Sequence, residues 1–300
     1  MDCVLSTAGR RHKGRTVKKT PLAARFTKQL VRVNDQVCFA ALQQWEFTQR
    51  LNLYVDDRPH EFTTDAFPEN PFAEVIYRRV GDLPKFSNEA EQIALQMGII
   101  AAAEYVLAYI EEVQKLRDEV SSDEVEPIRD DAEEEQLRLK ISRWCGGSPT
   151  AGYFRTLGYF RLLRNHYAHV NETPSPAFSS YIRSYGTPLN AFWNNGVTDI
   201  HQIVFRTLHT TSMTPDLAFG VMNLLRVSVQ HIDEMVAETL NLDEVARWIV
   251  LQIRTEPRAR QFHIKRMSSK VATRLRMDWN IEVPLPIVIE LVEDIILDTE

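Results

Sequence analysis

The chain has 300 residues, a net charge of −6 and 25% charged residues, a balance typical of a soluble globular protein. With only 11 glycines and 14 prolines, it is neither collagen-like nor wholly disordered. The three cysteines, Cys3, Cys38 and Cys145, are odd in number and far apart, which argues against a disulfide framework or a zinc ribbon. We find no secretory signal and no uninterrupted apolar stretch of membrane-spanning length, so we expect a cytoplasmic protein without a membrane partner.

Charge is distributed unevenly along the chain. Residues 10–19 hold six basic residues and no acid, and residues 254–276 hold eight basic residues against Glu256. Residues 118–135 hold ten acids against Arg129. A polyanion would therefore meet the two basic segments and avoid the acidic one.

The first part of the chain predicts a tail, a long helix and an irregular connection. Residues 1–20 are basic and nearly devoid of large apolar groups, so we expect a mobile tail. Apolar residues recur at helical spacing over residues 22–54. Residues 58–87 are rich in Pro, Asn, Asp and Phe and predict a long connection, with a short helix at Phe72–Arg79.

Three helices follow. Ser87 is a candidate N-cap for a second long helix over residues 87–119, with acids in its first turn. After the acidic linker, a shorter helix spans residues 132–144 and stops at Gly146. The helical spacing of residues 150–170 predicts a third main helix, closed by two prolines, Pro174 and Pro176.

The last part of the chain is helical as well. Residues 171–213 are aromatic- and Asn-rich with weak periodicity, and predict short helices and loops. Thr214 and Pro215 suit the start of a fourth main helix over residues 214–240. Three shorter helical runs follow, over residues 243–254, 262–277 and 286–297; only the β-branched run Ile281–Ile289 leaves a short strand as an alternative.

The pattern as a whole predicts an all-α protein, an up-and-down helical bundle with insertions and extra C-terminal helices. We expect a basic flexible tail over residues 1–20 and a helical bundle over residues 21–240. A helical, partly basic extension then covers residues 241–300.

The most informative segment ends the third main helix: Arg164, Asn165, His166, Tyr167, Ala168 and His169. It combines a permanent cation with groups that titrate near neutral pH, which suits phosphodiester chemistry without a metal. On a continuous helix, five residues place Arg164 and His169 roughly 140° apart. The two side chains converge on one ligand only if the helix ends or bends near His169.

These residues resemble the Arg-x4–6-His signature of HEPN domains, in which a polar residue such as Asn165 usually follows the arginine. The resemblance covers six residues closely and the all-α pattern over residues 22–240 loosely. It implies a helical bundle, and many members are metal-independent endoribonucleases of toxin–antitoxin, abortive-infection and CRISPR-associated systems. It also implies a homodimer that pairs two motifs across the subunit interface, and an antitoxin or defence partner.

The resemblance assigns roles to the motif residues. The ribose 2′-OH of RNA attacks the adjacent phosphorus while His169 exchanges protons with the attacking or leaving oxygen. Arg164 holds the phosphate and stabilises the developing charge, and Asn165 orients the pair. His166, off the family pattern, is a second acid–base group or a surface residue. No cofactor and no metal are expected, and DNA, which lacks the 2′-OH, should not be cut.

Other functions stay open. The spacing of His166, His169 and Glu172 offers ligands for a metal, although no fourth ligand is evident. The alternative function is that of a non-catalytic helical regulator, which binds nucleic acid or a partner through its basic residues. The residues that would bind nucleic acid are Arg258, Arg260, Lys265, Arg266, Lys270, Arg274 and Arg276.

The same basic segment also fits a solvated amphipathic helix that pairs with the acidic residues 118–135 or with a partner. An aromatic group just after the motif either stacks RNA bases or forms core. Its members are Phe178, Tyr181, Tyr185, Phe192 and Trp193.

Overall fold

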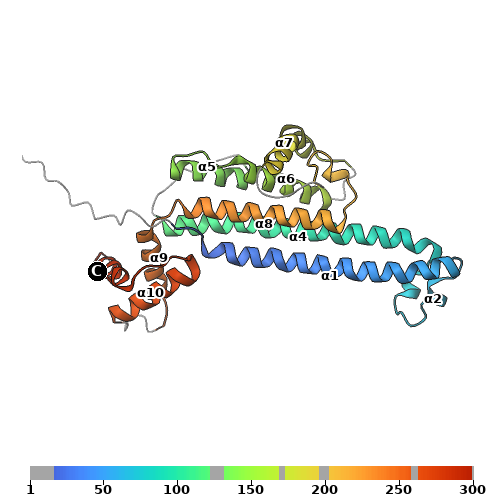
Figure 1. Cartoon of the computed structure of the whole chain (residues 1–300), viewed down its shortest axis with the longest axis horizontal. Helices are drawn as coiled ribbons and strands as arrows, with labels where there is room; N and C mark the ends of the chain where they lie inside the picture. Colours follow the sequence, from blue (N-terminus) through green and yellow to red (C-terminus); the bar gives the residue numbers. More distant parts are fainter. Residues whose placement is uncertain (1–16, 122–131, 169–172, 196–202, 258–262, 299–300) are drawn as a thin grey trace, which may run out of the picture. The chain divides into compact units, whose positions relative to one another are not determined.

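The computed structural model describes residues 17–121, 132–168, 173–195, 203–257 and 263–298. These residues are almost entirely helical and contain no β-strand, only a single bridge between Phe62 and Arg79. The predicted all-α helical bundle is thereby confirmed (Figure 1). Of the predicted mobile tail over residues 1–20, residues 1–16 lie outside the described residues, whereas Val17 and Thr20 are buried.

The helices follow one another with few long connections. Their bounds are α1 (Pro21–Asp57), α2 (Thr63–Ala66), α3 (Ala73–Ile76), the 3₁₀ helix η1 (Val80–Asp82), α4 (Leu83–Val120), α5 (Glu133–Cys145), α6 (Ala151–Ala168), α7 (Pro176–Asn194), the 3₁₀ helix η2 (Leu208–Thr210), α8 (Pro215–Ala237), α9 (Leu242–Arg254), α10 (Ile264–Trp279) and α11 (Leu285–Leu297).

Two start signals were misread in the sequence. Ser87 is not an N-cap, because α4 begins at Leu83 and Ser87 lies inside it, where its carbonyl accepts a hydrogen bond from Gln44. Pro176 does not close α6 but stands in the first turn of α7, and the hydroxyl of Ser175 accepts the amide N–H of Phe178 at 3.2 Å. The expected loops and short helices of residues 171–213 therefore include a 19-residue helix.

Other boundary signals are confirmed. The hydroxyl of Thr214 accepts the amide N–H of Leu217, as an N-cap does. At the end of α5, Gly146 takes a left-handed conformation with φ of 65°. The segment from Leu285 is the helix α11, so within the described residues the strand alternative for Ile281–Ile289 is wrong.

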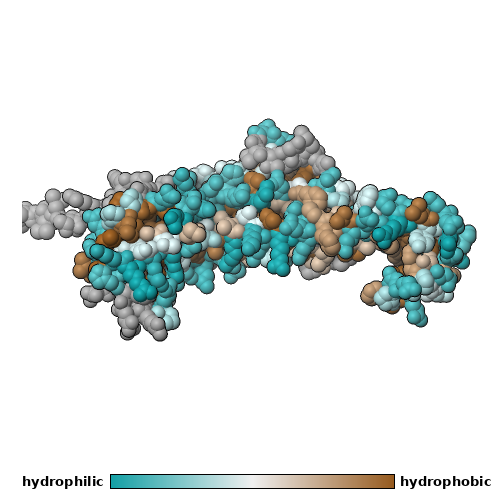
Figure 2. Space-filling view, turned by 60° about the horizontal axis from the view of Figure 1, so that its bottom comes forward, coloured by the Kyte–Doolittle hydropathy of each residue, from teal (hydrophilic) through white to brown (hydrophobic). Residues whose placement is uncertain are grey.

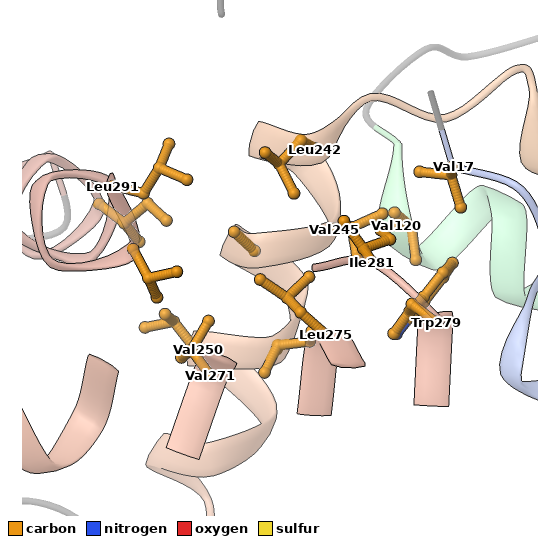
Figure 3. Close-up of a cluster of buried hydrophobic side chains, with 14 of the residues drawn as sticks. Val17, Val120, Leu242, Val245, Val250, Val271, Leu275, Trp279, Ile281 and Leu291 are labelled. Carbon is orange, nitrogen blue, oxygen red and sulfur yellow. The ribbon is translucent and has the colours of Figure 1, made fainter. Parts of the chain in front are cut away.

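The chain forms two compact units. One comprises residues 1–25, 109–151 and 229–300, and the other residues 26–108 and 152–228. The core of the first unit joins α9, α10 and α11 to the end of α4, through residues such as Val120, Val245, Leu275 and Trp279 (Figure 3). The C-terminal helices thus share a core with residues from the middle of the chain.

The second unit contains most of α1, α4 and α8, together with α6 and α7. At Gly98 of α4, an added Cβ would lie 2.4 Å from Cγ2 of Val37 in α1 and 3.4 Å from Cε of Met222 in α8. These three helices therefore pack closely here, and a larger residue at position 98 would push them apart. The motif helix α6 belongs to this unit, as does every residue of the candidate site.

Candidate functional site

The last turn of α6 carries Arg164, Asn165 and His166. The same helix buries Tyr159, Phe160 and Leu163, which anchor its orientation in the core. This register leaves the three motif residues partly exposed. His169, Arg164's expected catalytic mate, lies outside the described residues.

Arg164 meets two polar side chains. Its Nη1 donates a hydrogen bond to Oδ1 of Asn165 at 2.8 Å. Its Nε lies 2.9 Å from Oε1 of Glu104 in α4, but the N–H is not directed at that oxygen, and the contact is an ion pair rather than a hydrogen bond. Glu104 and Asn165 thus hold the guanidinium, and its Nε atom is buried without a hydrogen-bond partner among the described residues.

His166 lies beside a second histidine that sequence reasoning missed. The ring centroids of His166 and His209, from η2, are 6.0 Å apart. The ring of Phe178 in α7 packs against both, at 6.0 and 5.8 Å. No motif or spacing marks His209, because only the tertiary fold brings it to the end of α6.

Both imidazoles are neutral at pH 7. Burial lowers the pKa of His166, and burial together with the nearby charge of His166 lowers the pKa of His209. The Nδ1 atoms of both rings are buried without a hydrogen-bond partner in the described chain. A neutral histidine with a depressed pKa is a proton acceptor at physiological pH.

Two tyrosines add further unpaired groups. The hydroxyls of Tyr159 and Tyr167 are buried and have no hydrogen-bond partner among the described residues. Burial raises the pKa of Tyr167 to about 12 and raises that of Tyr159 further. Buried polar atoms are nearly always paired, so these four atoms without a partner among the described residues are unusual.

The basic segment is partly neutralised within its own unit. Lys270 and Arg274 of α10 both bind Glu256, at 2.6 and 2.7 Å. Lys265, Arg266 and Arg276 are exposed on the outer side of the helix, opposite its buried residues. The remaining two predicted residues, Arg258 and Arg260, lie outside the described residues.

The aromatic group is mainly core. Phe178 and Trp193 are buried, and the indole N–H of Trp193 donates to Oγ1 of Thr156 at 2.9 Å. The rings of Tyr181 and Tyr185 pack on each other, and the guanidinium of Arg155 lies 4.7 Å from the Tyr185 ring. The two tyrosines are the members of this group that remain suited to stacking.

The described residues contain no group of three or more His, Cys, Asp or Glu side chains placed to hold a metal ion. The metal-ligand alternative at His166 is not decided by this, since His169 and Glu172 lie outside the described residues.

One helix in the described chain, over Val80–Val120, is long and apolar enough by composition to cross a membrane. In its most apolar window, 44% of the residues are buried.

No family model, no curated protein and no solved structure matches the chain. The functional argument therefore rests on the residues of the site themselves.

Proposed function

We propose that the protein is a metal-independent endoribonuclease whose site lies at the C-terminal end of α6. The observation that carries the proposal is the occurrence, at the end of α6, of Arg164 with its bonded Asn165 and of His166, whose ring lies 6.0 Å from the ring of His209. A permanent cation binds phosphate, and neutral imidazoles move protons. The resemblance of the motif to HEPN domains supports the same reaction.

The proposed chemistry needs no metal and no cofactor. A histidine accepts the proton of the ribose 2′-OH, and the 2′-oxygen forms a bond to phosphorus as the bond to the 5′-oxygen breaks. A protonated histidine, for which His169 is the proposed residue, gives its proton to the leaving oxygen. Arg164 stabilises the charge on the non-bridging oxygens, and the products are a cyclic 2′,3′-phosphate and a 5′-hydroxyl.

The biological setting is part of the same proposal. The resemblance supports a toxin or anti-phage defence protein, working as a homodimer through the motif face and restrained by an antitoxin or defence partner. A cytoplasmic location fits an RNA substrate.

Cleavage of single-stranded RNA in EDTA tests the proposal. We expect Arg164→Ala and His169→Ala each to lower the rate at least 100-fold, since acid–base groups contribute about 10²–10⁴-fold. Arg226→Ala and His231→Ala serve as matched controls, because both residues lie on α8 and not on the motif helix α6. Undiminished cleavage in both motif variants, or cleavage of a 2′-deoxy substrate, would overturn the proposal.

A second candidate function is non-catalytic nucleic-acid binding through α10. It is favoured by Lys265, Arg266 and Arg276 on the outer face of that helix. It predicts salt-sensitive RNA or DNA binding without turnover, lost when these three residues are replaced by alanine. Binding that survives this triple replacement would exclude it.

A further inference from the structure

Exposed apolar surface does not by itself identify a ligand of this protein. Figure 2 shows apolar side chains in several patches among hydrophilic ones. Apolar surface is recognised by partners of many kinds, so these patches assign none. The distribution of charge is more selective, because one stretch of the chain differs in charge from the rest.

This stretch runs from the end of α5 to the start of α8. Residues 145–215 contain no lysine, five arginines and two acids, a net charge of +3 in a chain whose net charge is −6. The two acids, Glu172 and Asp199, lie outside the described residues. The described part of the stretch therefore contains arginines but no aspartate or glutamate, a balance that attracts a polyanion. The arginines are Arg155, Arg161, Arg164, Arg183 and Arg206.

Helices α6 and α7 meet along two stripes of side chains, which together form the α6–α7 seam. At 100° per residue, the members of the α6 stripe lie within about 40° of one another: Arg155, Tyr159 and His166. The members of the α7 stripe lie within about 60° of one another: Phe178, Tyr181 and Tyr185. Phe178 contacts Tyr159 and His166, whereas Tyr185 contacts Arg155, so the contacts run in opposite order along the two helices.

One end of the seam holds a stack of two tyrosines and an arginine. The ring centroids of Tyr181 and Tyr185 are 4.7 Å apart, and the guanidinium of Arg155 lies 4.7 Å from the centroid of the Tyr185 ring. The Tyr181 hydroxyl donates a hydrogen bond to the backbone carbonyl of Arg155 at 2.9 Å. All three residues are partly exposed. Aromatic rings and guanidinium planes of this kind are platforms on which nucleic-acid bases stack.

Two exposed arginines lie at the same turn of α7. Arg183 belongs to this turn. The stem of Arg206 lies against Gly186, where an added Cβ would be 2.9 Å from its Cγ. Within the described chain, no carboxylate pairs with Arg183, Arg206 or Arg155. Their guanidinium groups are therefore available to phosphate.

The other end of the seam carries the two histidines, His166 and His209. Eleven residues separate Arg155 from His166, a rise of about 16 Å along α6. At the stacked spacing of about 3.4 Å per nucleotide, roughly five nucleotides cover this distance. A strand that lies along the seam thus extends from the arginines to the histidines.

We propose that the α6–α7 seam is the binding site for single-stranded RNA. One or two unpaired bases stack against Arg155, Tyr181 and Tyr185. Arg183 and Arg206 hold the neighbouring phosphates. The assignment to RNA rests on the proposed ribonuclease function. Stacking and phosphate contact do not use the 2′-OH, so the seam also holds single-stranded DNA, whereas a duplex keeps its bases stacked inside.

Fluorescence anisotropy with a labelled single-stranded DNA of about eight nucleotides tests the site, because this probe binds but has no 2′-OH to cleave. The full chain is used, with helicity verified by circular dichroism. Tyr185→Ala should weaken binding at least fivefold, since stacking contributes about 1–3 kcal/mol per base, and Tyr185→Phe should change it less than about twofold. The double variant Arg183→Ala/Arg206→Ala should lower the slope of log K against log salt by about 1.4.

Two controls should leave the affinity unchanged. One is Arg226→Ala on α8, and the other is the triple alanine variant at Lys265, Arg266 and Arg276 of α10. Loss of binding in the triple variant would overturn the proposal and assign the probe to α10.

Three further outcomes would overturn it: no binding by wild type at about 100 µM in low salt, binding indifferent to both Tyr185→Ala and the double arginine variant, or equal affinity for a duplex of the same sequence. Cleavage is measured separately. If the probe binds as predicted while RNA stays intact, the seam is a nucleic-acid site and only the ribonuclease proposal fails.

Discussion

At the level of single residues, the two histidines beside Phe178 set the expected pH dependence. Their pKa values are lowered, so each loses its proton below pH 6.5 and is neutral at pH 7. If His166 or His209 is the base, kcat/KM should fall as the pH drops through that lowered pKa, with the acid-limb midpoint below 6.5. A pH–rate profile of wild type against His209→Gln measures this. An unchanged acid limb in both His209→Gln and His166→Gln would remove these residues from the reaction.

The contact between Glu104 and Arg164 gives a second expectation. The carboxylate of Glu104 is half exposed and competes with a phosphate for the same guanidinium. Glu104→Gln should therefore lower KM for RNA about two- to fivefold with kcat unchanged, the range of an exposed ion pair. A kcat loss without a change in KM would instead show that Glu104 positions Arg164 for the chemistry.

At the level of single residues, the sequence alone indicated some residues of the candidate site but not all of them. The bond between Arg164 and Asn165 was not predicted, because adjacent side chains on a helix do not normally face each other. His209 could not be found, because a histidine in a 3₁₀ turn has no spacing relation to residue 166. The sequence suggested residues 118–135 or a partner as the acids that pair with the basic helix, whereas Lys270 and Arg274 pair with Glu256, whose position depends on how the segment before α10 folds back.

At the level of helices, Gly98 fixes the approach of α1 to α4. Gly98→Ala would place a Cβ against Cγ2 of Val37, so we expect a loss of about 1–3 kcal/mol in the free energy of unfolding. Val37→Ala in the same chain should recover part of that loss, because it removes the clashing methyl. Urea denaturation of the two single variants and the double variant measures the coupling; fully additive losses would contradict the close approach.

Most helices were predictable because their apolar spacing persists over several turns, as in α1, α8 and α9. Boundaries were less predictable where two signals competed. Pro174 and Pro176 fit both the end of α6 and the start of α7. The signal that marks the start of α7 is the N-cap Ser175 followed by Pro176. Pro188, inside α7, further concealed that helix, since proline disfavours a helix interior.

At the level of the whole chain, a buried carboxylate joins distant segments of one unit. Asp233 of α8 accepts hydrogen bonds from the Thr20 backbone at 2.7 Å and from the Tyr109 hydroxyl at 3.1 Å. Burial, the largest influence, raises the pKa of Asp233 to about 6 despite these bonds. The contribution of Asp233 to stability is therefore full below pH 4 and is lost as the pH rises through 6.

This gives a prediction for stability. Between pH 4.5 and 7, the unfolding free energy of wild type relative to Asp233→Asn should fall by about 2 kcal/mol. Chemical denaturation at several pH values measures the difference. A difference that is constant over this range would show that Asp233 has an ordinary pKa.

The central claim, that the end of α6 cleaves RNA, is tested most directly by product analysis. Purified wild-type protein is incubated with a defined single-stranded RNA in EDTA, beside Arg164→Ala and the control Arg226→Ala. We predict fragments ending in a cyclic 2′,3′-phosphate from wild type and Arg226→Ala and none from Arg164→Ala. Intact RNA with wild type, or the same fragments from Arg164→Ala, would contradict the account.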